Sequence, residues 1–203
     1  MSSEAAPPRR RAPRRAPAER RAEIAAAARA IALADGLHAV TLRAIAARAS
    51  VTPALVAHYA PAMEELVATT FAGIVSDELA EVAQLVAGEA PRDALRALIE
   101  TLLSGTRDDV TAVWVEAWAL GRRSDPLAAA VREQMDAWAR LLREVIEEGA
   151  ADGSFRVEDP SAAAWQLLGM IDGLNAQALV RWGGAAERAE LLLRAAEAML
   201  GVR

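Results

Sequence analysis

Residues 49–66 read ASVTPALVAHYAPAMEEL, and this stretch decides how the N-terminal part of the chain is interpreted. Pro53 suits the first turn of a helix, because the N–H that proline lacks has no partner there. The hydroxyl of Thr52 can accept one of the free N–H groups of that turn. The pattern predicts a short helix from Pro53 to about Tyr59, whose outward residues are small or ring-bearing and carry no charge.

A second short helix is predicted just before this one, over residues 42–49 and capped by Thr41. Residues 49–52 would form the turn between the two helices. A short helix, a tight turn and a second short helix are the ingredients of a DNA-reading helix-turn-helix. A short helix that only packs as a connector gives the same spacing, so the spacing alone leaves both interpretations open.

Proline and glycine mark the remaining helix ends. Pro61, Pro91, Pro126 and Pro160 stand where helices can begin, and an Asp precedes the last two as a candidate cap. No convincing strand or repeat is present. We predict an all-α chain of about nine helices, at residues 18–34, 42–49, 53–59, 61–87, 91–104, 108–120, 126–151 and 160–182, with a last helix after residues 183–184.

Composition excludes several classes of protein. The 203 residues include no Cys and two separated His, so neither a thiolate site nor a metal-ligand pattern is present. There is no Ser/His/Asp set and no phosphate-cradling Gly loop. We therefore predict no enzymatic activity, no cofactor and no metal. Apolar runs stop well short of about 18 residues, so we predict no membrane span and a cytoplasmic location.

The charge is divided unevenly along the chain. Residues 1–63 hold ten Arg and four acids, whereas residues 64–203 hold thirteen Arg and twenty-four acids. Such asymmetry indicates nucleic-acid contact at the basic end. Residues 1–17, with five Arg and four Pro, are predicted to be a disordered arm. A basic tail without a partner is the alternative.

At residues 41–66 the sequence TLRAIAARASVTPALVAHYAPAMEEL resembles the operator-binding motif of TetR-family repressors. Within it, VTPALVAHY is similar to BetI-like members, and so is IDGLNAQALV at residues 171–180. The resemblance implies a three-helix DNA-binding domain at 18–63 and a helical effector-binding and dimerisation domain at 64–203. It further implies a homodimeric, ligand-responsive repressor that binds a palindromic double-stranded DNA operator and is released by a small-molecule effector.

The same resemblance assigns DNA contacts. Residues at the start of the first short helix would touch phosphate or a base edge, the start of the second would face the groove, and its ring-bearing end would contact the DNA backbone. In that order these residues are Thr41 and Arg43, then Thr52, Pro53, Ala54 and Leu55, then His58 and Tyr59.

Four positions depart from the family's pattern. Ala57 replaces a frequent Tyr, Ala60 a frequent Phe, Met63 the usual Lys and Ser50 the usual turn Gly. The changes at Ala57 and Met63 remove two phosphate contacts. We hypothesise that Arg43 and the Arg-rich arm compensate for them.

All five Trp lie in the acidic part, where they either pack in the core or line a ligand cavity. Residues 167–180 are apolar except for Asp172, Asn175 and Gln177, and the first two share a helix face. Buried polar groups need partners, either an effector or a second subunit; a face that is simply hydrated is the alternative. Tryptophan rings beside an acid suit a cationic ligand, and the resemblance implies choline-type effectors. The candidate ligand-binding residues are Trp114, Trp118, Trp138, Trp165, Asp172 and Asn175.

The last two predicted helices are the candidate dimer face, forming a four-helix bundle with their symmetry mates as in the family. Gly169 and Gly173 lie one turn apart and would permit close helix approach. The candidate interface residues are Gly169, Gly173, Leu179 and Trp182.

Two other functions are weighed against this interpretation. One is a sequence-neutral architectural DNA-binding protein that relies on the Arg arm. The other, disfavoured by the missing catalytic sets, is a helical enzyme.

Overall fold

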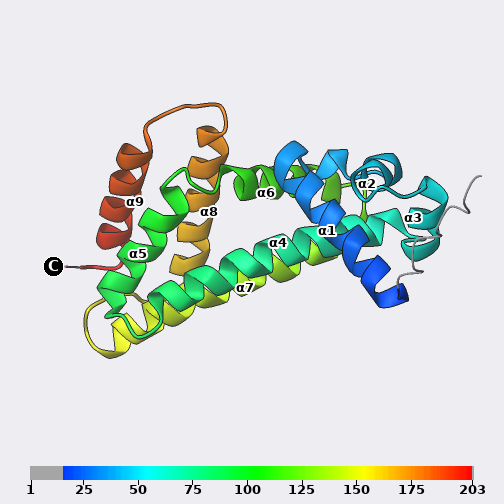
Figure 1. The fold of residues 1–203 in the computed structure, drawn as a ribbon. Helices are drawn as coiled ribbons and strands as arrows, with labels where there is room; N and C mark the ends of the chain where they lie inside the picture. Colours follow the sequence, from blue (N-terminus) through cyan, green and yellow to red (C-terminus); the bar gives the residue numbers. More distant parts are fainter. Residues whose placement is uncertain (1–15, 203) are drawn as a thin grey trace, which may run out of the picture.

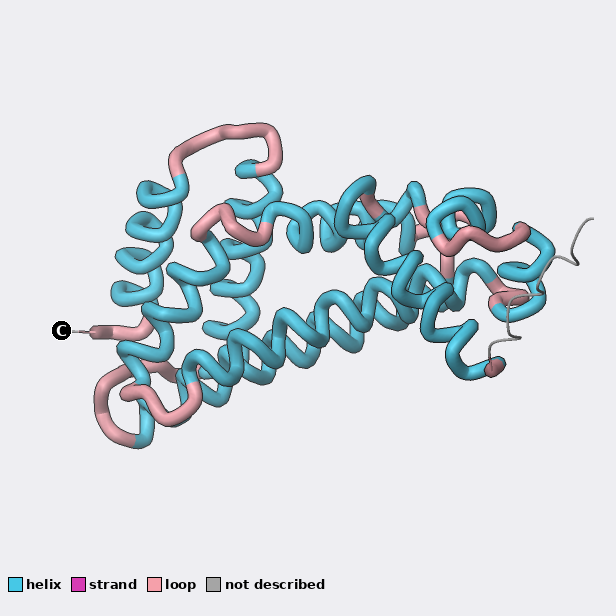
Figure 2. The backbone as a smooth tube through the Cα atoms, in the orientation of Figure 1, coloured by secondary structure: helices cyan, strands magenta, loops and turns pink. Residues whose placement is uncertain are grey.

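The computed structural model describes residues 16–202, and these form an all-α structure without a strand. Figure 1 and Figure 2 show the helices and the short connections between them. The elements are α1 (Pro17–Asp35), the short 3-10 helix η1 (Leu37–Ala39), α2 (Leu42–Arg48), α3 (Pro53–Tyr59), α4 (Met63–Val86), α5 (Pro91–Leu103), α6 (Asp108–Gly121), α7 (Asp125–Ala151), α8 (Pro160–Ala178) and α9 (Ala185–Met199). The prediction of an all-α fold is confirmed. The Arg arm lies almost entirely outside the described residues.

Caps and prolines start the helices largely as predicted. The Thr41 hydroxyl accepts from the Ala44 N–H at 3.2 Å, and Asp159 accepts from the first turn of α8 at 3.0 Å. The predicted cap at Asp125 is wrong. Ser124 precedes α7 and Asp125 is its first helical residue, so its charge lies in the positive first turn instead.

Two helix ends differ from the prediction by two residues or more, and one short helix was not predicted. The helix α4 begins at Met63, two residues after Pro61. The helix α8 ends at Ala178, because the chain turns through Arg181 at a positive φ of 61° before it reaches the Gly183-Gly184 pair. The 3-10 helix η1 was not predicted, since three residues are too few for a periodic pattern.

The helices form two ends joined by long helices. In Figure 1, α1, α2 and α3 gather at one end, and α5, α8 and α9 gather at the other. The helices α4 and α7 lie side by side and connect the two ends, and α6 packs against both α7 and α1. None of the described helices is long and apolar enough to cross a membrane. A displacement of helices in the end that holds α8 can therefore be transmitted to α1–α3 through α4, α6 and α7.

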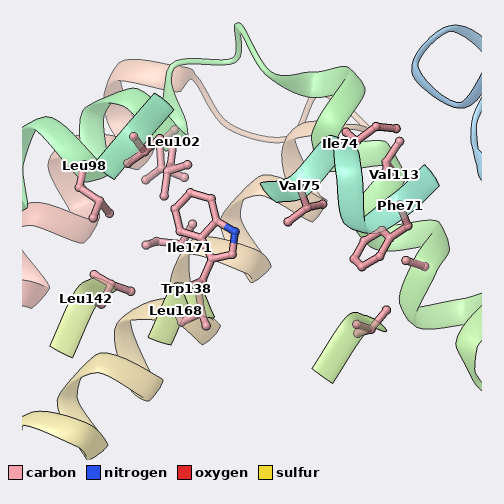
Figure 3. Close-up of a cluster of buried hydrophobic side chains, with 14 of the residues drawn as sticks. Phe71, Ile74, Val75, Leu98, Leu102, Val113, Trp138, Leu142, Leu168 and Ile171 are labelled. Carbon is pink, nitrogen blue, oxygen red and sulfur yellow. The ribbon is translucent and has the colours of Figure 1, made fainter. Parts of the chain in front are cut away.

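One continuous apolar core runs through both ends. In the small end, Ile24, Ile45 and Val56 are buried, and Leu66 at the start of α4 packs against them. In the larger end, side chains of α4, α5, α6, α7 and α8 interlock, as Figure 3 shows. Because a close-packed interior transmits displacement, the core links the two ends mechanically.

Candidate nucleic-acid interface and candidate ligand cavity

The helices α2 and α3 form the predicted helix-turn-helix. The turn depends on Ser50, which takes a positive φ of 53°, and on the Val51 N–H, which donates to the Ala46 carbonyl at 2.9 Å. Ser50, which stands where the family usually has Gly, thus occupies a conformation better suited to glycine. The structure thus holds α3 by local backbone bonds and one strained residue.

The outward face of α3 is small and exposed. Thr52, Pro53 and Ala54 are exposed, and Leu55 is half-buried. The Thr52 hydroxyl accepts from the Leu55 N–H at 3.3 Å, which leaves its O–H donor and one lone pair for DNA. This face can approach a major groove closely, because no long side chain stands in front of the backbone.

The basic and ring-bearing candidates surround this face. Thr41, Arg43 and His58 are exposed. Tyr59 is half-buried against the core, and the Arg21 guanidinium lies 5.8 Å from the centre of its ring. This Arg21 contact was not predicted, and it places a cation of α1 beside the end of α3.

A cavity of about 460 Å³, including its open mouth, lies in the larger end. Helices α4 to α8 all contribute to it, and its wall combines apolar, aromatic and polar side chains. The lining residues are Glu78, Leu102, Thr111, Trp114, Met135, Trp138, Leu168, Ile171, Asp172 and Asn175. Mostly apolar cavities with a few convergent polar groups are the usual form of small-molecule sites.

The structure brings together most of the predicted ligand residues. Trp114, Trp138, Asp172 and Asn175 line this cavity. Trp118 lines a smaller adjoining cleft that shares Trp114, Asp172 and Asn175, and its ring centre lies 5.6 Å from that of Trp114.

Trp165 lies outside the group and is corrected from a cavity residue to a surface residue. Its side chain is 73% exposed, because its position on α8 faces away from α5, α6 and α7. The exposed side of α8 also carries Gly169 and Gly173, where an added Cβ would meet no atom within 4 Å. Of the other candidate dimer residues, Leu179 is half-buried and Trp182 is exposed.

Two carboxyl groups give the cavity its charge. Burial raises the pKa of Asp172 to about 7, and no other described side chain forms an ion pair or hydrogen bond with it. Burial also raises the pKa of Glu78 to about 7, although Arg107, whose Nη1 lies 3.7 Å from Glu78 Oε1, lowers it. Both groups therefore change charge near neutral pH.

Glu78 is a cavity residue that was not predicted, although the sequence carries a signal for it. Ile74, Glu78 and Val82 are spaced four apart and occupy the buried stripe of α4. An acid on an apolar stripe indicates a buried charge that needs a partner. Glu78 also lines a second, open cleft of about 700 Å³ between α1, α4 and the start of α6.

Two polar contacts join α1 and η1 to the larger end. Arg29 of α1 pairs with Asp77 of α4 at 2.8 Å. Glu116 of α6 accepts the backbone N–H of His38 at 3.0 Å and lies 3.0 Å from its ring Nδ1. Because α6 also carries Trp114, one helix touches both the cavity and the end that holds the helix-turn-helix. Among the described residues, no group of three or more His, Asp or Glu is arranged to hold a metal ion.

Two family models match the chain. Residues 24–70 match the model described as bacterial regulatory proteins, tetR family, and residues 91–201 match the BetI-type transcriptional repressor C-terminal model. The chain belongs to the TetR family, with a BetI-type C-terminal domain. This TetR-family protein is 31% identical over 166 residues to the HTH-type transcriptional regulator BetI of Rhizobium meliloti (strain 1021), covering 78% of this chain and 76% of that relative. It is a transcriptional regulator and not an enzyme.

Solved structures share the fold of this TetR-family chain. A regulator from Rhodococcus sp. has a TM-score of 0.75 and 20% identity, covering 90% of this chain and 99% of the other. A regulator from Saccharomonospora viridis in complex with choline has a TM-score of 0.75 and 24% identity, with coverages of 86% and 94%. FadR from Bacillus subtilis, in complex with stearoyl-CoA, has a TM-score of 0.71 and 16% identity, with coverages of 88% and 98%. In these relatives, one fold thus accommodates ligands of unlike chemistry.

Proposed function

We propose that this TetR-family regulator is a homodimeric repressor that binds a palindromic operator and is released by a small cationic effector. The observation that carries the proposal is Asp172, a carboxyl group without an ion-pair or hydrogen-bond partner among the described residues, in a cavity walled by tryptophan rings. A cation would be the counter-ion that such a carboxylate lacks, and the faces of the tryptophan rings would attract the cation further.

The DNA part of the proposal rests on the exposed face of α3. In a twofold-symmetric dimer, two copies of α3 would enter successive major grooves about 34–36 Å apart. Ala54 and Leu55 would make apolar contacts with base edges, and Thr41 and Arg43 would contact phosphate or a base edge. The direct contacts of this face are few, so phosphate contacts by arginine carry much of the affinity.

The charge of the cavity favours a ligand with a single positive charge. Glu78 lies 3.7 Å from Arg107, which also pairs with Glu81 at 3.1 Å, so of the two cavity carboxyl groups Asp172 is the one without a cationic neighbour among the described residues. The choline complex of the Saccharomonospora viridis regulator supports a quaternary ammonium ligand for this cavity too. A dication would leave one of its charges unpaired and buried, which is costly.

The dimer part rests on the exposed side of α8 and its neighbour α9. Trp165, Val180, Trp182 and Leu191 are large apolar side chains left exposed in the single chain. Exposed apolar groups in one region mark a protein interface. Gly169 and Gly173 on α8 have no side chain and would let a symmetry-related helix approach closely, as helix–helix contacts in bundles require.

Release would be a population shift carried by α6. A ligand against Trp114 favours one position of α6, and Glu116 on the same helix holds η1 through His38. A ligand acts in this way only if it binds one arrangement of the readers better than the other. In the arrangement that the ligand favours, the distance between the two α3 helices would not match the distance between the two half-sites of the operator.

A fluorescence-anisotropy titration tests the effector and operator parts together. Labelled DNA from the region upstream of the gene is compared with random DNA of equal length, each with and without choline. We expect tighter binding to the upstream DNA and its loss with choline. Asp172→Asn should keep DNA binding but lose the response, whereas Asp136→Asn, at an exposed position of α7, should keep both. Equal affinity for both DNAs would favour the architectural alternative.

Sedimentation of two matched variants tests the dimer. Trp165→Glu places a charge on the proposed face and should yield monomers. Leu85→Glu, at a 50% exposed position of α4, should leave the mass unchanged. A Trp165→Glu protein that remains dimeric would contradict the proposed face.

A further inference from the structure

The C-terminal end of α3 carries little positive charge of its own. The helix contains His58 but no arginine. The next charged residues along the chain are Glu64 and Glu65, which are exposed and negative in the first turn of α4. DNA presents a dense row of negative phosphates on both sides of the major groove. If α3 lies in that groove, a cation beside its C-terminal end must therefore come from another part of the fold.

The helix α1 has one arginine whose charge is not balanced by an acid. Arg20 pairs with Glu23 at 2.6 Å, and Arg29 pairs with Asp77 at 2.8 Å. The third arginine of this helix, Arg21, is exposed and forms no ion pair with any described residue. Its positive charge is thus available to a partner outside the chain.

The position of this charge is set by Tyr59 at the end of α3. The Arg21 guanidinium lies 5.8 Å from the centre of the tyrosine ring, within the roughly 6 Å over which a cation is attracted to an aromatic face. The ring is half-buried, packs against the core and has an edge contact with His58 at 5.0 Å, so it offers a fixed surface. Figure 1 shows the first turns of α1 at the same end of the molecule as α3.

The guanidinium keeps its hydrogen-bonding capacity in this position. No described acceptor takes a hydrogen bond from Arg21, so its N–H groups remain free for an anion. A guanidinium presents these donors in a flat fork that matches two oxygens of a phosphate. Arg21 therefore combines a defined place beside α3 with unused charge and unused donors.

We infer that Arg21, held against Tyr59, binds a phosphate of the DNA backbone beside the C-terminal end of α3. The inference rests on the proposed binding of DNA by α3 and adds α1 as a third helix that contacts the duplex. Thr41 and Arg43 lie at the start of α2, so Arg21 would hold the backbone at a separate point. A phosphate contact fixes the position of a protein but does not read the sequence. Arg21 would thus strengthen binding to any duplex.

Fluorescence anisotropy over a range of salt concentrations tests this contact. Arg21→Gln removes the charge from an exposed side chain, and its binding to upstream DNA and to a random duplex of equal length is compared with the wild type. We expect about tenfold weaker binding to both duplexes. The slope of log affinity against log salt should fall by about 0.9 for each copy of the chain, or about 1.8 for a dimer.

Two further variants show whether the effect belongs to this contact. Arg48→Gln removes the same charge from the same domain at an exposed position of α2, where the side chain borders an open hollow with Glu23 and Ala26. Its slope should stay near that of the wild type. Arg21→Lys keeps the charge without the flat fork, so its slope should be preserved even where its affinity falls.

The outcomes separate this inference from the proposed function. An unchanged slope in Arg21→Gln, or an equal reduction in Arg48→Gln, would overturn the inference alone. If the wild type binds upstream and random DNA equally, the operator part of the proposed function fails, whereas a reduced slope in Arg21→Gln would still support the inference. If the wild type binds neither duplex, both fall together.

Ethylation interference locates the contact on the DNA. In this experiment single phosphates of the upstream fragment are ethylated, which removes their charge, and the fragments that still bind are identified. We expect one phosphate in each half-site to hinder the wild type when it is ethylated but to be tolerated by Arg21→Gln. Identical interference patterns for the two proteins would overturn the inference, even if the slope had changed.

Discussion

Binding of a cation in this cavity should depend steeply on pH. Burial raises the pKa of Asp172 to about 7, so the carboxyl group of the unliganded protein is largely neutral at pH 6 and largely ionised at pH 8. A cation is attracted to the ionised form. Binding below pH 7 must therefore expel a proton, and the affinity should fall as the pH falls through about 7.

The size of the effect follows from the ionised fraction. With a pKa of about 7, that fraction is roughly 0.1 at pH 6 and roughly 0.9 at pH 8, so the affinity should change about tenfold, or about 1.4 kcal/mol. If Glu78, whose pKa is also about 7, had to ionise as well, the change would approach a hundredfold, by the same reasoning. We expect the smaller value, because Asp172 is the carboxyl group without a cationic neighbour among the described residues, and a bound cation therefore needs that group to be ionised first.

Calorimetry in buffers of different ionisation enthalpy counts the protons released. We expect roughly 0.9 proton per choline at pH 6 and roughly 0.1 at pH 8. Asp172→Asn should bind weakly at every pH, without the slope, whereas Asp136→Asn should behave as the wild type. Choline binding at pH 6 without proton release, or a slope that survives Asp172→Asn, would refute the reasoning.

The raised pKa of Asp172 also sets the sign of a stability effect. Between about pH 4 and pH 7 the folded carboxyl group retains a proton that the unfolded chain has lost. The unliganded protein should therefore lose stability as the pH rises through this window, and Glu78 adds in the same direction. Denaturant unfolding at pH 5 and pH 8 should show a smaller difference for Asp172→Asn than for the wild type.

Three further predictions concern the contacts between the two ends and the DNA. Gly36→Ala should destabilise the fold by about 1–2 kcal/mol in denaturant unfolding, because Gly36 has a φ of 89° and a Cβ there would meet the Glu116 carboxylate. The control is Gly73→Ala on α4, where a Cβ would meet no atom within 4 Å, and this change should be neutral or slightly stabilising. Glu116→Ala should reduce the effect of choline on operator affinity while changing choline affinity itself less than about threefold, as anisotropy and calorimetry would show; unchanged coupling would exclude Glu116 as the link. Deleting residues 1–17 should weaken operator binding and reduce the slope of log affinity against log salt by about 0.9 for each phosphate that the arm neutralises. Arg43→Ala should act in the same direction. An unchanged slope after the deletion would exclude phosphate contacts by the arm.

Local signals in the sequence predicted the helices well. Thr52-Pro53 and Asp159-Pro160 start helices in the structure, because capping and the missing proline N–H act within one turn. The end of α8 was misplaced by four residues, since the chain turns at Arg181 and not at the following glycines. A positive φ at an arginine depends on packing that the local sequence does not reveal.

The cavity was predicted in part. Trp114, Trp138, Asp172 and Asn175 meet as expected, because a face of polar residues on an apolar helix needs a buried partner. Trp165 could not be separated from the others, since one tryptophan on a helix gives no direction by itself. The contact between Glu116 and His38 joins residues 78 positions apart, and no periodic pattern predicts such a pair.

Glu78 lines two separate hollows of the protein, and this matters if the regulator is to be engineered as a biosensor. Its side chain lines the proposed ligand cavity and also the cleft next to α1, where its partner Arg107 immediately precedes α6. A substitution chosen there to admit a new inducer would also alter the ion pair between α4 and the residue that precedes α6. Background expression and inducer preference would then change together. Libraries that vary Met135 and Leu168, which line the cavity but not that cleft, should retune the inducer while the background stays low.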